Sequence, residues 1–306
     1  MKDMQEQLRQ LMDSRKVTSR YHQMINQAVS DPQVQAFLKA NQEALADDAI
    51  VKGAAKIYEF VNERTKYEKG IQSFAPGYQP QLTVTNGQLD IAYEPTKQKL
   101  AQEKAVAQRR LVNAINMPKA IATATLDQYD PTSRSEALQA AVTFTVGVAQ
   151  APHAFHKGLY LTGPFGVGKT YLIGAIANEL AEQGVASTLL HVPTYAVEMK
   201  DAIKSNSVLT KINAIKAAPV LMLDDIGAEA LSPWFRDEVL GIILQYRMQE
   251  ELPTLFTSNK TMAELNHFLA GVERGDNEQL KASRLMERVR FLSTEIAVGG
   301  VDRRNG

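Results

Sequence analysis

One eight-residue segment of this chain has the residue types and spacing that bind a phosphate chain. Residues 163–170 read GPFGVGKT and match G-x-x-x-x-G-K-[ST] in full. The glycines let consecutive N–H groups turn inward around phosphate oxygens, and the helix expected to begin at Lys169 points its partial positive end at the same anion. Lys169 is expected to reach the β- and γ-phosphates, and the Thr170 hydroxyl to hold Mg²⁺. The predicted nucleotide-binding residues are Gly163, Pro164, Phe165, Gly166, Val167, Gly168, Lys169, Thr170 and Tyr171.

A second segment supplies the carboxylates that such a site needs. Four apolar residues, 220–223, predict a strand buried on both faces, and Asp224 and Asp225 follow it directly. The carboxyl ends of parallel strands are where α/β sheets bind ligands. We expect Asp224 to hold Mg²⁺ and Asp225 to polarise the attacking water. Glutamate usually takes the second position, so the shorter Asp225 predicts slow or partner-dependent hydrolysis.

A polar amide follows another apolar run. Residues 255–259 read LFTSN, and Asn259 could hydrogen-bond the γ-phosphate or the water beside it. Asn259 could equally cap a helix that begins near Thr261. The residues alone leave both interpretations open.

Two arginines near the end of the chain could stabilise charge in phosphoryl transfer. Arg284 and Arg288 lie four residues apart in SRLMERVR and therefore share a helix face. A guanidinium group supplied by a neighbouring subunit can act on a γ-phosphate. A solvated helix with surface ion pairs is the alternative. Four lysines could track single-stranded DNA, although a charged helix is usually only a wet face; they are Lys200, Lys204, Lys211 and Lys216.

Composition limits the other kinds of site. The chain has 306 residues, 34 basic and 34 acidic side chains, and no cysteine. Disulfides, thiolate nucleophiles and cysteine zinc sites are therefore excluded. His153 and His156 are close in sequence, but no neighbouring ligand completes a metal set. The polar start is not a signal peptide and no apolar run could span a bilayer, so we expect a soluble cytoplasmic protein of two domains.

The first hundred residues predict helices and one hairpin. Met4 and Leu8 begin a helical pattern, Asp31-Pro32 opens a second helix, and residues 49–67 form a third. Asn-Gly at residues 86–87, between two alternating runs, is the strongest short hairpin signal. Residues 97–116 read as a charged connecting helix.

The rest of the chain alternates strands and helices. This pattern predicts a parallel sheet covered by helices on both faces. We expect an N-terminal domain over residues 1–116 and an α/β domain over residues 117–306. The five predicted strands cover residues 158–161, 185–192, 220–223, 253–257 and 294–298.

Taken together, GPFGVGKT, LMLDDIG, LFTSN and SRLMERVR resemble the AAA+ ATPase domain of the DnaC/DnaI helicase loaders. With its separate N-terminal region and the lead-in MPKAIATATLDQYD, the whole chain is most similar to the primosomal, DnaI-type members. The resemblance implies ATP and Mg²⁺ as cofactors and self-association through the ATPase domain, with Arg288 acting in trans and Arg284 as a second phosphate- or interface-facing arginine. It implies an N-terminal domain that grips the hexameric replicative helicase and an ATPase domain that contacts single-stranded DNA.

The sequence departs from that pattern in two places. DnaI-type N-terminal domains typically carry a cysteine-rich zinc site, whose ligands would fall in residues 65–80, so we expect a metal-free variant. The chain stops soon after its last predicted strand, which implies an ATPase domain without a helical lid. Two other functions share parts of the pattern: an IstB-like ATP-binding transposition helper, which predicts a different N-terminal domain, and a metabolic P-loop kinase, which Asn259 and the paired arginines disfavour.

Overall fold

The computed structural model describes residues 23–71, 73–229, 231–271 and 276–303. The chain folds into two compact units, residues 1–104 and residues 105–306, and each is described by itself. The helix predicted around Met4 and Leu8 lies outside the described residues.

The first unit packs short helices against a hairpin. Asp31 caps α3 because its carboxylate accepts from the backbone N–H groups of residues 33 and 34. Gly53 separates α4 from α5 in the stretch predicted as one helix. The core is built from Val34, Ile57, Phe60, Leu82 and Leu89, with neighbours. Residues 23–29 are also helical, and the helices that follow are α3 (Pro32–Ala40), η1 (Gln42–Ala44), α4 (Ala49–Lys52) and α5 (Ala54–Glu68).

The predicted hairpin is confirmed. Strands β1 (Tyr78–Thr85) and β2 (Gln88–Pro95) pair antiparallel, with Thr85 opposite Gln88 across the turn. Asn86 and Gly87 occupy the turn with φ of 51° and 77°. Positive φ at both central residues is what a two-residue turn between twisted strands requires, and Asn-Gly adopts it at least cost.

The second unit contains a six-stranded sheet in the order β3-β5-β6-β7-β4-β8, in which every pairing is parallel. The strands of apolar residues are buried because helices cover both faces. The carboxyl ends of three neighbouring strands, β6, β7 and β4, lie at the same edge. The strands are β3 (Val112–Ile115), β4 (Gly158–Thr162), β5 (Ser187–His191), β6 (Val220–Asp224), β7 (Thr254–Ser258) and β8 (Ser293–Ala297).

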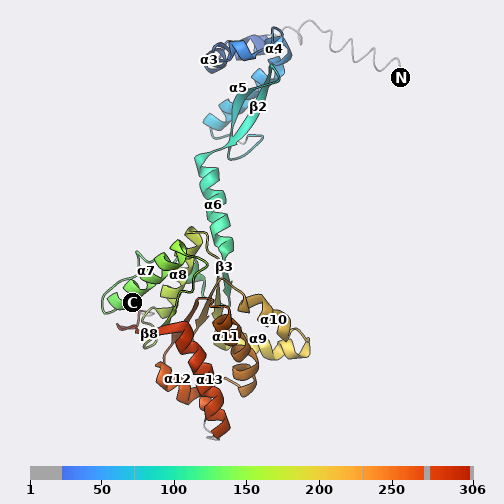
Figure 1. Ribbon diagram of the computed structural model, residues 1–306. Coiled ribbons are helices and arrows are strands. Elements are labelled where there is room, and N and C mark those ends of the chain that lie inside the picture. Colours follow the sequence, from blue (N-terminus) through green and yellow to red (C-terminus); the bar gives the residue numbers. More distant parts are fainter. Residues whose placement is uncertain (1–22, 72, 230, 272–275, 304–306) are drawn as a thin grey trace. The chain divides into compact units, whose positions relative to one another are not determined.

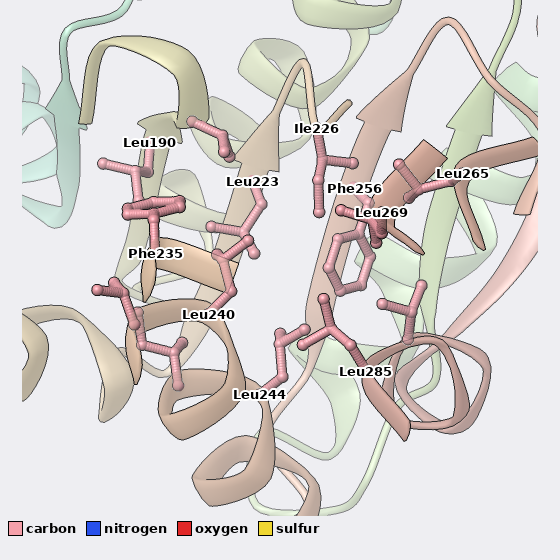
Figure 2. Close-up of a cluster of buried hydrophobic side chains, with 14 of the residues drawn as sticks. Leu190, Leu223, Ile226, Phe235, Leu240, Leu244, Phe256, Leu265, Leu269 and Leu285 are labelled. Atoms are coloured by element: carbon pink, nitrogen blue, oxygen red, sulfur yellow. The ribbon is translucent and has the colours of Figure 1, made fainter. Parts of the chain in front are cut away.

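Two groups of helices cover the two faces (Figure 1). Helices η2 (Lys119–Thr123), α7 (Ser135–Gln150) and α8 (Lys169–Glu182) contribute to one core cluster. On the other face, the side chains labelled in Figure 2 converge from the strands and the opposing helices, with Leu223 and Phe256 from the sheet meeting Leu240 and Leu285. The helices of this second face are α9 (Val192–Lys204), α10 (Val208–Lys216), η3 (Phe235–Leu240, a π-helix), α11 (Gly241–Gln249), α12 (Met262–Ala270) and α13 (Asp276–Leu292).

The predicted connecting helix over residues 97–116 is shorter in the structure. The connecting helix α6 (Lys97–Leu111) stops at Leu111 instead of continuing to residue 116, and the chain then forms the edge strand β3. Residues 112–115 pair in parallel with residues 187–190 of β5. The run Val-Asn-Ala-Ile is too short to carry a strand signal of its own, and the exposed edge of β5 decides its conformation. This strand belongs to the sheet although it precedes the boundary predicted after residue 116.

Candidate nucleotide-binding site

The glycine-rich segment surrounds a cavity of about 480 Å³ at the carboxyl edge of the sheet. Residues 163–168 link β4 to the first turn of α8, so the loop lies where the central strands end. Gly168 has a φ of 96°, a conformation that favours glycine. The cavity is lined by Pro118, Ala120, Ile121, Phe165, Gly166, Gly168, Lys169, Thr170, Tyr171, His191, Asp224, Asp225, Thr257, Asn259 and Arg303.

The Lys169 ammonium group is buried beside this loop. It donates to the carbonyl oxygens of Gly163 and Pro164, each at 2.7 Å, and to Asn259 Oδ1 at 2.7 Å. The loop carbonyls and the amide thus hold the charge at the floor of the cavity. The position suits a cation that must meet phosphate oxygens.

Asp224 lies at the end of β6 and is 3 % exposed. Its carboxylate accepts from the Thr257 hydroxyl at 2.6 Å and from the Thr170 hydroxyl at 3.0 Å. Burial raises the pKa of Asp224 above its usual range, and the nearby Asp225 carboxylate adds to the rise. A buried carboxylate whose ionisation is costly is stabilised by a cation, and hard oxygen donors are the ligands that Mg²⁺ prefers. The donor set of Thr170 and Asp224 therefore fits Mg²⁺.

Asp225 follows β6 and Asn259 follows β7, and the two side chains are in contact. Asp225 has a φ of 61°, and its N–H donates to the Thr257 hydroxyl at 2.8 Å. Asn259 Nδ2 donates to Asp225 Oδ1 at 3.3 Å while its Oδ1 accepts from Lys169. The alternative in which Asn259 caps the following helix is wrong, because Thr261 caps α12 in a reciprocal capping box with Glu264.

Arg134 contacts the backbone of the glycine-rich loop, a contact that the sequence did not predict. Arg134 is 4 % exposed, and its guanidinium donates to the carbonyl oxygens of Val167 at 2.6 Å and Asp130 at 2.7 Å. It also lies over the Tyr129 ring, 4.2 Å from its centroid, and Tyr129 stacks on Tyr171. Arg134 precedes α7 in a polar stretch without a motif, so no local pattern indicates its role. Thr257 and Arg303 were missed as well; only Thr257, inside the LFTSN segment, lay within a motif.

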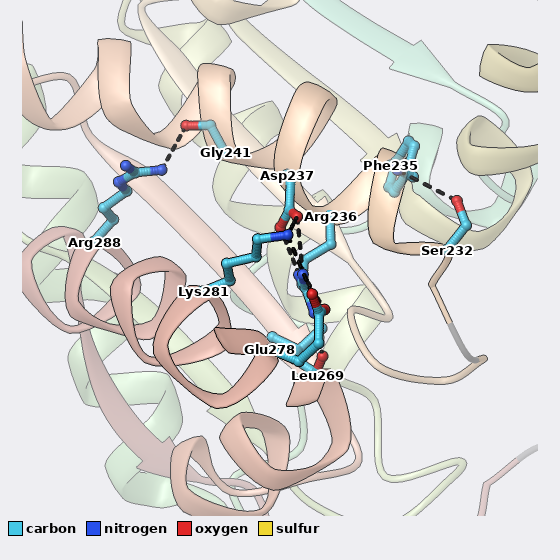
Figure 3. A network of polar contacts seen from close by, with 9 residues as sticks. All are labelled: Ser232, Phe235, Arg236, Asp237, Gly241, Leu269, Glu278, Lys281 and Arg288. Atoms are coloured by element: carbon cyan, nitrogen blue, oxygen red, sulfur yellow. Dashed lines mark hydrogen bonds and ion pairs between the residues drawn. The ribbon is translucent and has the colours of Figure 1, made fainter. Parts of the chain in front are cut away.

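Arg284 and Arg288, the two arginines predicted to act on the γ-phosphate, are not among the residues that line the cavity of their own chain. Arg284 is exposed, whereas Arg288 is half-buried and donates to the Gly241 carbonyl at 2.9 Å (Figure 3). Burial and the neighbouring Arg284 charge lower the pKa of Arg288. An ion network also joins α13 to the π-helix, because Glu278 and Lys281 contact Arg236 and Asp237 at 2.7 to 3.4 Å. The network and the Gly241 contact hold the arginine-bearing helix on one outer face of the domain.

The four lysines have mixed surroundings. Lys204 pairs with Asp201 at 3.1 Å and Lys211 with Glu198 at 3.2 Å. Lys216 lies over the Tyr246 ring, and Lys200 is exposed. DNA contact by these residues stays a prediction.

The described part of the chain offers neither a cluster of metal ligands nor a membrane-spanning helix. Residues 23–303, apart from the short gaps, contain no group of three His, Asp or Glu side chains placed to hold a metal ion. In the same part of the chain no helix combines the length and apolarity needed to cross a membrane.

The parallel sheet, the glycine-rich loop between β4 and α8, and the carboxylates at the end of β6 define a P-loop protein of the AAA+ class. Comparison with known proteins identifies the family. Residues 72–302 match the family model of the IstB-like ATP binding protein, and residues 1–93 match that of the primosomal protein DnaI N-terminus. This chain belongs to the DnaI-type helicase loaders.

Three relatives show how far the similarity extends. The chain is 39 % identical over 295 residues to the replicative helicase loader DnaI of Bacillus subtilis, covering 94 % of each chain. A crystal structure of DnaI matches with a TM-score of 0.56 and 44 % identity over 64 % of this chain and 99 % of that one. The crystal structure of a putative primosome component from Streptococcus pyogenes matches with a TM-score of 0.54 and 43 % identity over 65 % and 98 %. The fold and the family predicted from the sequence are thereby confirmed.

Proposed function

We propose that this protein is an ATP-dependent loader of the replicative DNA helicase. Residues 1–116 bind the hexameric helicase, and residues 117–306 bind ATP and single-stranded DNA and associate with further copies of the chain. The carrying observation is the convergence of Lys169, Thr170, Asp224 and Asn259 on one cavity, in a chain whose residues 1–93 match the DnaI N-terminus.

Different groups of the cavity bind the phosphates and Mg²⁺. The N–H groups of the loop from Gly163 to Thr170 and the N-terminus of α8 receive the phosphates, and phosphate oxygens replace the loop carbonyls as acceptors for Lys169. Thr170 and Asp224 hold Mg²⁺, which neutralises charge on the β- and γ-phosphates when bound. Tyr171 and Phe165 border the same cavity.

Hydrolysis depends on Asp225 and on a second subunit. Asp225 accepts a proton from, or orients, the attacking water, and Asn259 holds the Asp225 carboxylate through its amide. Because Arg284 and Arg288 do not line the cavity of their own chain, we assign them to the site of a neighbouring subunit. Hydrolysis is then slow in the isolated chain and rises when partners bring subunits together.

The transposition-helper alternative shares the ATPase core but predicts a different N-terminal domain. The match of residues 1–93 to the DnaI N-terminus favours the loader.

A reconstituted loading reaction tests the proposal. Helicase, single-stranded DNA and this protein are combined with ATP, and helicase bound to DNA is counted after gel filtration. Loading should rise with the wild-type chain and not with Lys169→Ala, and residues 97–306 alone should fail although they bind ATP. Co-elution with a transposase and not with helicase would instead support the transposition helper.

A further inference from the structure

A buried arginine contacts the glycine-rich loop from outside the nucleotide cavity. Arg134 directly precedes α7, is 4 % exposed, and is not among the described residues that line the cavity. Its guanidinium donates to the Val167 carbonyl through Nη1 at 2.6 Å and to the Asp130 carbonyl through Nη2 at 2.7 Å. Arg134 therefore acts on the backbone of the loop and not on the space that a nucleotide would occupy.

The contact fixes the direction of one peptide group in the loop. The Val167 C=O and the Gly168 N–H belong to the same trans peptide, in which the two groups point in opposite directions. Because Arg134 holds the carbonyl outside the cavity, the N–H is turned the other way, and Gly168 does line the cavity. An N–H group needs this direction to donate to a phosphate oxygen.

The guanidinium is itself held in place by its neighbours. It lies over the Tyr129 ring at 4.2 Å from the centroid, and a Cβ atom added at Gly168 would come within 2.6 Å of Arg134 Nη1. The group thus contacts both an aromatic ring and the backbone of a residue that has no side chain. Asp130 Oδ2 lies 4.0 Å from Nη2, so a carboxylate accompanies the buried charge. Packing, charge and hydrogen bonds together fix the position of Arg134.

Without this contact the peptide between residues 167 and 168 can rotate. Gly168 has a φ of 96°, and glycine adopts positive and negative φ about equally readily. In the rotated orientation a carbonyl oxygen faces the phosphates in place of an N–H, and two negatively polarised groups meet. A ligand that binds only one of two orientations loses affinity in proportion to the fraction of chains in the other.

We infer that Arg134 is a positioning residue for ATP: it holds the Val167 carbonyl away from the cavity and so presents the Gly168 N–H to the phosphate chain before the nucleotide binds. This inference rests on the proposed ATP site. It adds to that site a residue that lies outside the glycine-rich loop and acts only through the loop backbone.

A graded series of substitutions at position 134 tests this role. The terminal nitrogen of lysine stands one bond short of Nη1 and that of glutamine two bonds short, whereas methionine has no donor. Arg134→Met and Arg134→Gln should weaken ATP binding about tenfold, the loss expected when about one chain in ten has the binding orientation. Arg134→Lys should recover part of the affinity, because a small shift brings its ammonium group to the Val167 carbonyl.

Isothermal titration of the full chain with ATP and Mg²⁺ measures the affinity, and steady-state hydrolysis with helicase present measures the rate. At saturating ATP the rate of Arg134→Met should stay within about twofold of the wild type, because bound phosphate keeps the peptide turned. Circular dichroism shows which variants fold, and Arg134→Gln carries the comparison if Arg134→Met does not.

Arg247→Lys is the matched control. Arg247 is also a buried arginine that donates to backbone carbonyls, those of Ala218 and Pro253, but it lies near the amino ends of β6 and β7. The variant should bind ATP like the wild type even though it loses stability. Destabilisation of the sheet is thereby separated from the orientation of the loop.

The outcomes distinguish this inference from the proposed function. Wild-type affinity in the variants that lack the Val167 contact overturns the inference and leaves the proposed ATP site standing. An equal loss in Arg247→Lys, or an Arg134→Lys variant as weak as Arg134→Met, also overturns it. A saturated rate that falls as far as the affinity does the same, since the side chain then acts in the reaction itself. A wild-type chain that binds no ATP refutes both the inference and the proposed function.

Discussion

A buried charge lies at each end of strands β6 and β7, Arg247 of α11 at the amino end and Asp224 of β6 at the carboxyl end, and the two charges are satisfied differently. At the amino end, Arg247 is 0 % exposed and donates to the carbonyls of Lys216, Ala218 and Pro253 and to the Thr254 hydroxyl at 2.6 to 2.9 Å. At the carboxyl end, Asp224 accepts from two hydroxyl groups and borders a cavity.

The comparison separates a buried charge that is enclosed by hydrogen bonds from one that borders a cavity. Every nitrogen of the Arg247 guanidinium donates a hydrogen bond within the protein. Burial still lowers the pKa of Arg247 to about 9. Asp224 has the opposite arrangement, since its charge is buried at the edge of open space where a cation can enter. A buried charge beside a cavity, rather than burial alone, therefore indicates a binding site.

Removing the structural charge should have the largest effect on stability. Arg247→Ala leaves three buried carbonyls and a hydroxyl without their donor, and we expect the free energy of unfolding to fall by about 3–5 kcal/mol. Urea denaturation measures the change. The exposed Arg290→Ala is the control, and a loss below 1 kcal/mol in Arg247→Ala would mean that water satisfies these carbonyls.

Arg288 provides a third case, a half-buried arginine bonded to one backbone carbonyl. If it acts on a neighbouring subunit, Arg288→Ala should lower steady-state ATP hydrolysis in the assembled protein by about 10³-fold while ATP binding stays the same. Mixing Arg288→Ala with a hydrolysis-deficient Asp225→Asn chain should restore part of the activity, because each supplies what the other lacks. No restoration would contradict action in trans.

Lys169→Ala tests the cavity directly. The substitution removes the buried ammonium group that Asn259 and the loop carbonyls hold, and ATP affinity should fall by about 100-fold or more. The unfolding midpoint without nucleotide should change little, in contrast to Arg247→Ala. A fluorescent ATP analogue reports the affinity, and unchanged binding would exclude this cavity as the nucleotide site.

Asp224→Asn should have the smallest effect, and it should raise the stability of the nucleotide-free protein, whereas Arg247→Ala lowers it. The folded-state pKa of Asp224 is raised, so stability decreases as pH rises from the unfolded value towards the folded one, and the cost persists above it. At pH 7 the variant should therefore be more stable than the wild type. This gain should vanish near pH 4, and Mg²⁺ should no longer tighten ATP binding. Thermal unfolding at both pH values checks this sign, and a less stable variant at pH 7 would contradict it.

The difference between the two ends also explains which residues could be predicted from the sequence. The glycine-rich loop, Asp224, Asp225 and Asn259 follow predicted strands directly, and parallel strands bring their carboxyl ends to one edge, so local patterns sufficed. Arg134 and Arg303 lie far from the loop in sequence. Arg134 contacts the loop carbonyl of Val167 through its guanidinium, and Arg303 contacts that of Gly166 through its backbone N–H; a backbone carbonyl carries no sequence signal.

The sequence by itself determined the periodic and contiguous features of this protein: the hairpin at Asn86-Gly87, the alternation of strands and helices, and the glycine-rich loop between a strand and a helix. Each depends on backbone preferences and apolar spacing within a few residues. Tertiary structure alone decided that residues 112–115 form an edge strand, that Arg247 is buried among backbone carbonyls, and that Arg303 reaches the cavity beside the glycine-rich loop. These outcomes depend on which backbone groups and charges come into contact after folding. The residues in contact are far apart in sequence, so no local sequence pattern predicts them.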